Sequence, residues 1–271
     1  MYQIYSIIIF FIASMVFDCH QNKPDPNFHI YILMGQSNMA GRGRITEEFK
    51  NERNTRLLML NKSNVWVMAE HPLHFDKPNI VGVGPGMAFG LSMLEDNNKK
   101  IKIGLVPCAV GGTPIEDWEP KAYNKATNTY PYDEALIRIK EAKKSGIIKG
   151  IIWHQGEGNS SPEKSLIYIS QLNSLILRVR ENIGNQSLPF VIGELGYYKE
   201  IYNNINTELK KVPSLIPYTA IASSEGLNHN GDGTHFDSQS ARTLGFRLAE
   251  KMKDIQKQSA AVSKKSKPIL P

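Results

Sequence analysis

The chain of 271 residues is long enough for one large domain, and its 41% of hydrophobic residues can fill a substantial core, which excludes a short peptide and a wholly disordered chain. The net charge of +6 falls to +3 when the lysine-rich C-terminal tail and the first eighteen residues are set aside, and no basic stripe interleaved with aromatic side chains is present, so no nucleic-acid partner is expected. No apolar run reaches the roughly 20 residues that a membrane-spanning helix needs, and two cysteines are too few for a disulfide framework.

The N-terminal segment has the pattern of an export signal. Ile4 to Phe17 is almost uninterrupted apolar sequence, so we expect residues 1–18 to be a signal peptide and residues 19–27 to be a polar linker. A buried first strand or helix is the alternative, because no Lys or Arg precedes the apolar stretch. Cys19 stands where a bacterial lipoprotein would be acylated, although the residues before it are not small. The protein is therefore expected to be secreted, periplasmic or attached to the outer envelope, with a possible lipid anchor at Cys19.

From residue 28 onward, short apolar runs alternate with longer amphipathic segments, which is typical of parallel strands covered by helices on both faces. Buried strands are predicted at His29–Met34, Lys102–Pro107, Lys149–His154, Phe190–Glu194 and Tyr218–Ala222. Helices are predicted at Met87–Asp96, Tyr132–Lys144, Pro162–Ile183, Asn203–Val212 and Ser238–Ile255. Arg56–Leu60 and Val65–Met68 are short strand candidates. The sequence thus predicts a three-layer α/β/α sandwich with a central, mostly parallel five-stranded sheet over residues 28–256, followed by a disordered basic tail at residues 257–271.

Polar residues and glycines follow several of these strands. In such sheets ligands bind at the carboxyl ends of the strands, so residues at those positions are expected to meet. The segments in question are Gly35-Gln36-Ser37-Asn38, Gly111-Gly112-Thr113, Gln155-Gly156-Glu157 and residues 228–237.

Together these segments supply the groups of an acyl-transfer site. A nucleophilic serine needs a base, and the base needs a partner that fixes its tautomer. Ser37, His235 and Asp232 fit these roles, since Asp232 is three residues from His235 in a glycine-flanked loop. The oxyanion requires hydrogen-bond donors. Candidates are the backbone N–H of Ser37, a backbone N–H at Gly111 or Gly112, and the side-chain amide of Gln155.

Other chemistries are less well supported. Position 39 is Met, so the serine does not lie in a Gly-x-Ser-x-Gly elbow, and no Gly-Lys-Ser/Thr phosphate loop is present. A metal could be considered at His229, Asp232, His235 and Asp237, but no His-x-x-x-His helix or cysteine pair supports one. We therefore expect neither a metal nor a cofactor.

Four motifs resemble those of the SGNH-hydrolase superfamily, and more narrowly its branch of sialate O-acetylesterase-type domains and sixth-family acetylxylan esterases. They are Gly35–Gly43, Gly111–Trp118, Trp153–Glu157 and Asp232–Phe236, and the resemblance runs from about Phe28 to about Lys253. It implies that Ser37 is the nucleophile, that Asp232 and His235 form the dyad, and that Ser37, the Gly111–Gly112 pair and Gln155 provide the oxyanion donors. Many superfamily members have Asn where this chain has Gln155.

The resemblance leaves one catalytic assignment open. Glu157 has been considered in this branch as a partner of the histidine, either in place of Asp232 or with it. The short spacing within one loop favours Asp232, and a structural carboxylate is the alternative role for Glu157.

Three further residues are expected near the substrate. Asn38 follows the nucleophile and is assigned to substrate binding with Arg42 and Trp118. Arg42 could contact a uronate or sialate carboxylate, although a salt bridge is the favoured role. For Trp118 a core position and a sugar subsite are equally consistent with the sequence.

The sequence therefore predicts a serine carbohydrate O-acetylesterase that acts on acetylated oligo- or polysaccharide. Plant-wall xylan is the first candidate substrate and acetylated sialic acid the second, both supplied by the resemblance. A lipase or thioesterase and a non-catalytic carbohydrate-binding relative are the rival functions. The oligomeric state is not predicted.

Overall fold

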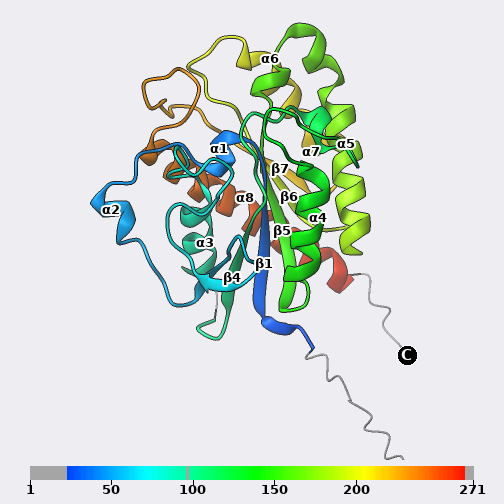
Figure 1. The fold of residues 1–271 in the computed structure, drawn as a ribbon. Helices are drawn as coiled ribbons and strands as arrows, with labels where there is room; N and C mark the ends of the chain where they lie inside the picture. Colours follow the sequence, from blue (N-terminus) through cyan, green and yellow to red (C-terminus); the bar gives the residue numbers. More distant parts are fainter. Residues whose placement is uncertain (1–22, 96–97, 266–271) are drawn as a thin grey trace, which may run out of the picture.

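The computed structural model describes residues 23–95 and 98–265 (Figure 1). The expected signal peptide and Cys19 lie outside the described residues. Within these ranges, no helix is both long and apolar enough to cross a membrane.

Seven strands form one sheet in the order β3-β2-β4-β1-β5-β6-β7, and every neighbouring pair is parallel except β2 with β3. The strands are β1 (Asp25–Gly35), β2 (Leu57–Leu60), β3 (Trp66–Met68), β4 (Lys102–Pro107), β5 (Gly146–His154), β6 (Phe190–Gly193) and β7 (Thr219–Ala222). The helices are α1 (Ser37–Ala40), α2 (Glu47–Lys50), α3 (Gly86–Glu95), α4 (Pro131–Ala142), α5 (Pro162–Ile183), α6 (Tyr202–Leu209), α7 (Val212–Leu215) and α8 (Ser238–Lys265), with the short 3-10 helices η1 (Ile115–Trp118) and η2 (Glu157–Asn159).

The helices form a layer on each face of the sheet, as Figure 1 shows. Alternate residues of the central strand β1 point to opposite faces. Ile32 packs in the core beneath α4, α5 and α6, whereas Leu33 packs in the core beneath α3 and α8. The predicted three-layer α/β/α architecture is confirmed.

The predicted number of five strands was too low. The two short candidates at positions 56–68 join the sheet as β2 and β3, because β2 pairs in parallel with β4 and β3 then folds back on β2. β3 has a weak signal in the sequence because it is three residues long and none of its side chains is fully buried, whereas β2 contributes buried side chains such as Leu57 and Leu60.

Three element boundaries also differ from the prediction. β1 begins at Asp25, inside the expected linker, because it extends far enough to pair with Gly146 of β5. The predicted helix at 203–212 is two helices, since Pro213 in the first turn of α7 has no N–H with which to continue α6. α8 continues to Lys265, so most of the expected disordered tail is helical.

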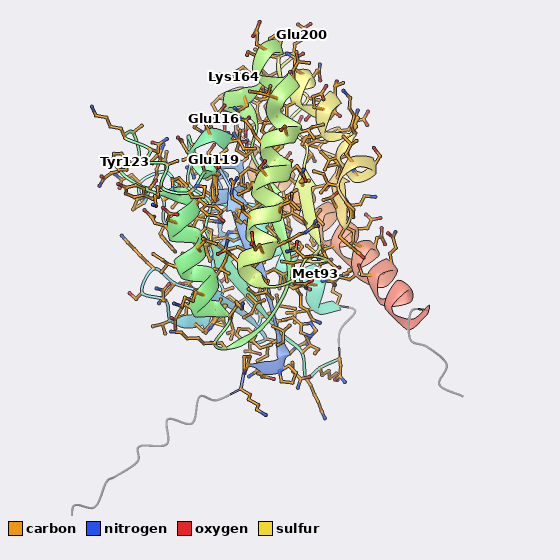
Figure 2. The ribbon with its side chains drawn as sticks, turned by 90° about the vertical axis from the view of Figure 1, so that its right-hand side faces the viewer. Met93, Glu116, Glu119, Tyr123, Lys164 and Glu200 are labelled. Atoms are coloured by element: carbon orange, nitrogen blue, oxygen red, sulfur yellow. The ribbon has the colours of Figure 1, made fainter. Side chains whose placement is uncertain are left out.

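The polar segments identified from the sequence lie at one end of the molecule. Figure 2 shows Lys164 near the start of α5 and Glu116 of η1 at the same end as Glu200, whereas Met93 of α3 lies lower. This end is where the parallel strands terminate, and it contains the residues described in the next subsection.

β1 and β5 pack closely at Gly35, the last residue of β1, and this contact fixes the backbone just before Ser37. Gly35 has a φ of +126°, and a Cβ at this position would lie 2.1 Å from the backbone oxygen of His154. The next residue, Gln36, donates its backbone N–H to the same oxygen at 2.9 Å. Only glycine allows this approach.

We expect Gly35→Ala to lower the free energy of unfolding by about 3 kcal/mol or more, because backbone strain and a steric clash with β5 act together. Gly226→Ala is the matched control. Gly226 also has a positive φ, of +76°, but no atom lies within 4 Å of the added methyl, so a loss of only about 1 kcal/mol is expected. Urea unfolding measures both values, and equal losses would contradict the proposed clash.

Candidate active site

Ser37 lies at the tip of the central strand. It is the first residue of α1, which follows β1 after the single residue Gln36. The helix ends after one turn at Gly41, whose φ is +99° and whose N–H donates to the Ser37 backbone oxygen at 2.8 Å. The serine is therefore held on a tight backbone turn at the carboxyl end of the central strand, with 7% of its surface exposed.

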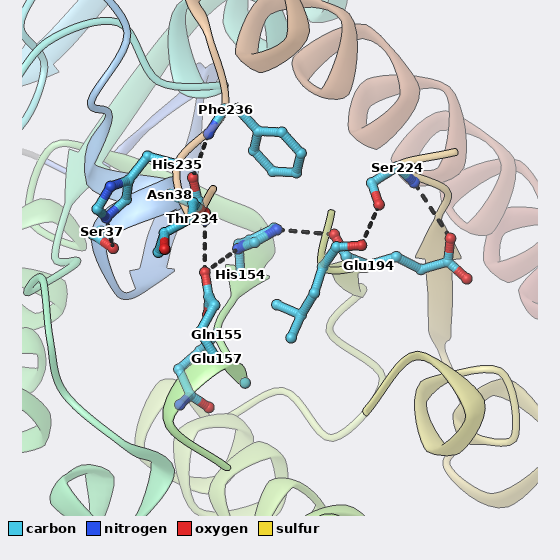
Figure 3. Close-up of polar contacts among 12 residues, drawn as sticks. Ser37, Asn38, His154, Gln155, Glu157, Glu194, Ser224, Thr234, His235 and Phe236 are labelled. Atoms are coloured by element: carbon cyan, nitrogen blue, oxygen red, sulfur yellow. Dashed lines mark hydrogen bonds and ion pairs between the residues drawn. The ribbon is translucent and has the colours of Figure 1, made fainter. Parts of the chain in front are cut away.

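The structure brings Ser37, His235 and Asp232 together in a hydrogen-bonded relay. Ser37 Oγ lies 2.9 Å from His235 Nε2, and His235 Nδ1 lies 2.6 Å from Asp232 Oδ2. Figure 3 shows the imidazole beside the serine. With its proton on Nδ1, the imidazole donates a hydrogen bond to the carboxylate, which leaves Nε2 free to accept the serine proton.

Asp232 is held as a carboxylate by its own loop. Its Oδ1 accepts the backbone N–H groups of Thr234 and His235, each at 2.8 Å. Partial burial opposes ionisation, but these two hydrogen bonds and the His235 side chain outweigh it and lower the pKa of Asp232 to about 2. The carboxylate is thus charged at any pH at which an esterase would work.

The loop that carries the dyad is a compact hairpin of the segment 228–237. Asn230 N–H donates to the His235 carbonyl at 2.8 Å, and Asp237 N–H donates to the Asn228 carbonyl at 3.1 Å. His229 Nδ1 accepts the N–H of Gly231 at 2.9 Å, so this histidine stabilises the turn. Among the described residues, no group of three or more His, Cys, Asp or Glu side chains could hold a metal ion.

The Asn38 side chain does not face the substrate, which corrects our expectation. It is 3% exposed, and its amide joins three segments. Nδ2 donates to Glu157 Oε1 at 2.6 Å and to the Thr234 carbonyl at 3.1 Å, and Oδ1 accepts the Phe236 N–H at 3.0 Å. Asn38 therefore fixes the histidine loop against the nucleophile turn (Figure 3).

Glu157 does not contact His235. Its Oε1 accepts from Asn38 and lies 3.8 Å from Nδ1 of the fully buried His154. Burial lowers the pKa of His154, and its Nε2 lies 2.9 Å from the Glu194 backbone oxygen. Of the two carboxylates considered from the sequence, only Asp232 contacts the imidazole of His235, and Glu157 accepts from the Asn38 amide that fixes the loop.

Two backbone N–H groups beside the serine are suited to bind an oxyanion. No hydrogen bond within the described residues engages the N–H of Ser37 or of Gly112, and Gly112 is exposed with a φ of +89°. The N–H of Gly111, in contrast, donates to Asp76 Oδ2 at 2.8 Å. Of the Gly111–Gly112 pair, the available donor is therefore that of Gly112.

The Gln155 side chain is fixed within the core. Its Oε1 accepts from the Tyr168 hydroxyl at 2.8 Å, and its Nε2 donates to Asn159 Oδ1 at 2.9 Å. No described contact joins this amide to Ser37, so its role as an oxyanion donor stays a prediction.

Trp118 and Arg42 are also buried away from a substrate. Trp118 is 0% exposed, donates Nε1 to Thr113 Oγ1 at 3.2 Å and packs edge-on against Trp153, so the sugar-subsite alternative was wrong. The Arg42 side chain is 5% exposed and forms a 2.7 Å salt bridge with Asp76, which was the favoured alternative. The assignment of both residues to substrate binding is not supported.

Sequence analysis missed two residues that support the site. Asp76 lies in an irregular segment without a motif, and nothing in its spacing links it to position 42 or 111. Tyr198 donates its hydroxyl to the Thr234 carbonyl at 2.9 Å and packs edge-on against His229 and Phe236. Its position in a loop after β6, at the carboxyl edge of the sheet, was the only available signal.

Comparison with known families gives one extensive match. The model of a family described as carbohydrate esterase, sialic acid-specific acetylesterase, matches residues 27–254. These residues include every strand except the start of β1, and all the groups described above.

Individual proteins agree with this match. A probable carbohydrate esterase of Arabidopsis thaliana is 32% identical over 251 residues, which cover 84% of this chain and 91% of the relative. The X-ray structure of this Arabidopsis protein superposes with a TM-score of 0.74 at 29% identity, covering 85% of this chain and 99% of that chain. A carbohydrate acetylesterase from Xanthomonas citri has the same fold, with a TM-score of 0.63 at 19% identity, covering 84% of this chain and 57% of that chain.

The depressed pKa of Asp232 predicts how its contribution to stability depends on pH. An aspartate whose pKa falls from 3.8 to about 2 on folding stabilises the folded state above about pH 4 and loses this contribution as the pH falls toward 2. We expect Asp232→Asn to be less stable than the wild type at pH 7 and at pH 5. The difference should shrink between pH 4 and pH 2. Urea unfolding at each pH tests this, and a difference that grows on acidification would contradict it.

Proposed function

The chain belongs to the sialic acid-specific acetylesterase family of carbohydrate esterases, and we propose that it is a serine O-acetylesterase that removes acetyl groups from carbohydrate through an acetyl-enzyme intermediate. The observation that carries this mechanism is the relay of hydrogen bonds from Ser37 through His235 to Asp232, at 2.9 Å and 2.6 Å.

In the first half-reaction, Ser37 Oγ attacks the acetyl carbonyl carbon while His235 Nε2 takes the hydroxyl proton. The carbonyl oxygen becomes an oxyanion, which the N–H groups of Ser37 and Gly112 stabilise. The tetrahedral intermediate collapses with cleavage of the bond to the sugar oxygen. The imidazolium returns its proton to that oxygen, so the sugar leaves as a neutral alcohol and the acetyl group remains on Ser37.

The second half-reaction uses the same groups. A water molecule attacks the acetyl-enzyme and His235 takes one of its protons. Collapse of the second tetrahedral intermediate returns that proton to Ser37 Oγ and releases acetic acid. Asp232 remains ionised throughout and stabilises the imidazolium in both steps, which its low pKa supports.

For the substrate, we propose acetyl esters on plant-type polysaccharides such as xylan. The sequence resemblance to acetylxylan esterases supports this choice. Acetylated sialic acid is the second candidate, which the description of the matching family favours. A non-catalytic carbohydrate-binding protein is less consistent with an intact serine relay, because such a protein has no need for a serine within 2.9 Å of an imidazole.

We expect the purified wild-type protein to hydrolyse p-nitrophenyl acetate and to release acetate from acetylated xylan, and Ser37→Ala to lose about 10³-fold or more in kcat on both substrates. Acetate release from xylan, pectin, mannan and O-acetyl sialoside measures the substrate preference. Equal rates for wild type and Ser37→Ala would eliminate the serine mechanism, and activity on the sialoside alone would replace xylan as the substrate.

The two carboxylates should differ in effect. Asp232→Asn removes the negative charge and, because the retained oxygen is held by the Thr234 and His235 N–H groups, places an amide nitrogen toward His235 Nδ1, so it is expected to lower kcat by about 10²- to 10⁴-fold. Glu157→Gln keeps a side-chain oxygen that can accept from Asn38, so we expect less than a 10-fold loss. Steady-state kinetics on p-nitrophenyl acetate compares the two variants directly. A larger loss in Glu157→Gln would show that Asp232 is not the principal partner of the imidazole.

A further inference from the structure

A buried ion pair lies next to the turn of residues 37–41, which carries the proposed nucleophile Ser37. Arg42 Nη2 and Asp76 Oδ2 are 2.7 Å apart, with 5% and 1% of their side chains exposed. Burying two charges is costly, and the mutual attraction compensates only when geometry and further hydrogen bonds are favourable. Both residues make such additional bonds, and these bonds lead to the catalytic groups.

The pair connects the two turns that flank the serine. Arg42 Nη1 donates to the Gly41 carbonyl at 2.7 Å, at the end of the helix that begins with Ser37. On the other side, Asp76 Oδ2 accepts the Gly111 N–H at 2.8 Å. One carboxylate oxygen thus binds the guanidinium of one turn and the backbone of the other.

The backbone at Gly111 packs directly on this pair. A Cβ at Gly111 would lie 2.2 Å from Arg42 Nη2, 2.8 Å from Asp76 Oδ2 and 3.3 Å from Ser37 Cβ. Glycine is therefore required here by close approach to the ion pair and to the serine. Because the Gly111 N–H is occupied, the N–H of the following residue, Gly112, is the one left to face a ligand.

We propose that Arg42 and Asp76 are positioning residues that set the place of the Gly112 N–H relative to Ser37 and so complete the oxyanion hole. Neither residue touches the substrate. The inference rests on the proposed serine-esterase function, since an oxyanion forms only in that reaction.

The strength of the pair suits this task. Charge-assisted hydrogen bonds are about twice as strong as neutral ones, and a donor displaced by about 1 Å can cost 10²-fold in rate. Burial opposes ionisation of Asp76, but the Arg42 guanidinium and the Gly111 N–H outweigh it and keep its pKa below the usual value. The support for the turn therefore stays charged at neutral pH.

The test compares four variants with the wild type on p-nitrophenyl acetate. Asp76→Ala and Arg42→Met are each expected to lower kcat by about 10- to 100-fold with KM changed less than 3-fold, because the donor acts mainly on the transition state. Asp76→Asn retains one acceptor for Gly111 and should lose less. The double variant Arg42→Met/Asp76→Ala should lose no more than the worse single variant, since the pair acts as one unit.

A second measurement separates positioning from general destabilisation. Methylboronic acid forms a tetrahedral adduct on a serine hydroxyl, and its inhibition constant should rise in parallel with the loss in kcat. Arg180→Met is the matched control. Arg180 is also buried and donates to the carbonyls of Leu188, Pro217 and Tyr218, which lie just before β6 and β7, at the end of the sheet away from Ser37. This variant should unfold at a lower temperature yet keep wild-type kcat and inhibition.

Each outcome decides the question. If the Asp76 variant that folds keeps wild-type kcat and wild-type boronate inhibition while Ser37→Ala is inactive, the positioning role is wrong and the proposed function stands. If Arg180→Met shows the same kcat and boronate losses as the Asp76 variants, the effect is one of stability and the inference is overturned. If Ser37→Ala is fully active, the serine-esterase function fails and the inference fails with it.

Discussion

The placement of the histidine loop beside Ser37 depends on one side-chain amide, that of Asn38. Asn38 bonds to segments that are 119 and 196 to 198 residues away in the sequence, and it satisfies one acceptor and both donors in doing so. A planar amide is suited to this because it offers donors and an acceptor in one rigid group, whereas a carboxylate offers no donor and a hydroxyl only one. Because Asn38 follows Ser37 directly in the chain, the segments that its amide binds are held at a fixed position relative to Ser37. The hairpin that carries Asp232 and His235 lies outside the sheet, and this amide, the Tyr198 hydroxyl and the contact of His235 with Ser37 are among the bonds that hold it against the strand ends.

Three carboxylates surround the serine, and the structure separates their roles by their partners. Asp232 faces the imidazole, Glu157 accepts from Asn38, and Asp76 binds Arg42 and the Gly111 N–H. Each negative charge near Ser37 is therefore offset by a donor or a cation of its own, so that Glu157 and Asp76 do not compete with Asp232 for His235. An isolated buried carboxylate would instead raise its own pKa and take up a proton.

The sequence predicted best what local chemistry determines. β4 and α5 begin and end at the predicted residues. For α5 the reason is visible: Ser161 caps the first turn, proline occupies its first position, and Gly184 in a left-handed conformation ends it. The residues of the relay could be named from their motifs, because a serine after a strand and an Asp-x-x-His loop are recognisable without knowledge of the fold.

Residues whose roles depend on long-range packing could not be placed from the sequence. Asn38, Arg42 and Trp118 stand in motifs next to catalytic positions, and proximity in sequence suggested contact with a substrate. Their side chains turn inward because partners such as Asp76 and Glu157 arrive from distant segments, and no periodicity encodes those meetings. The strands β2 and β3 were left out of the predicted five for a similar reason, since β3 gains its place only by pairing with β2.

The separation of Ser37 and His235 also has a consequence for synthesis of the chain. The two groups that share the catalytic hydrogen bond are 198 residues apart. A ribosome that makes the chain from the N-terminus completes Ser37 early and His235 late, after the strands of the sheet have been made. Contacts of such long range also form slowly, because a large loop must be closed before they contribute stability. On the proposed mechanism, the nascent polypeptide therefore lacks its base for most of its translation, until the last strand and the loop beyond it have been made.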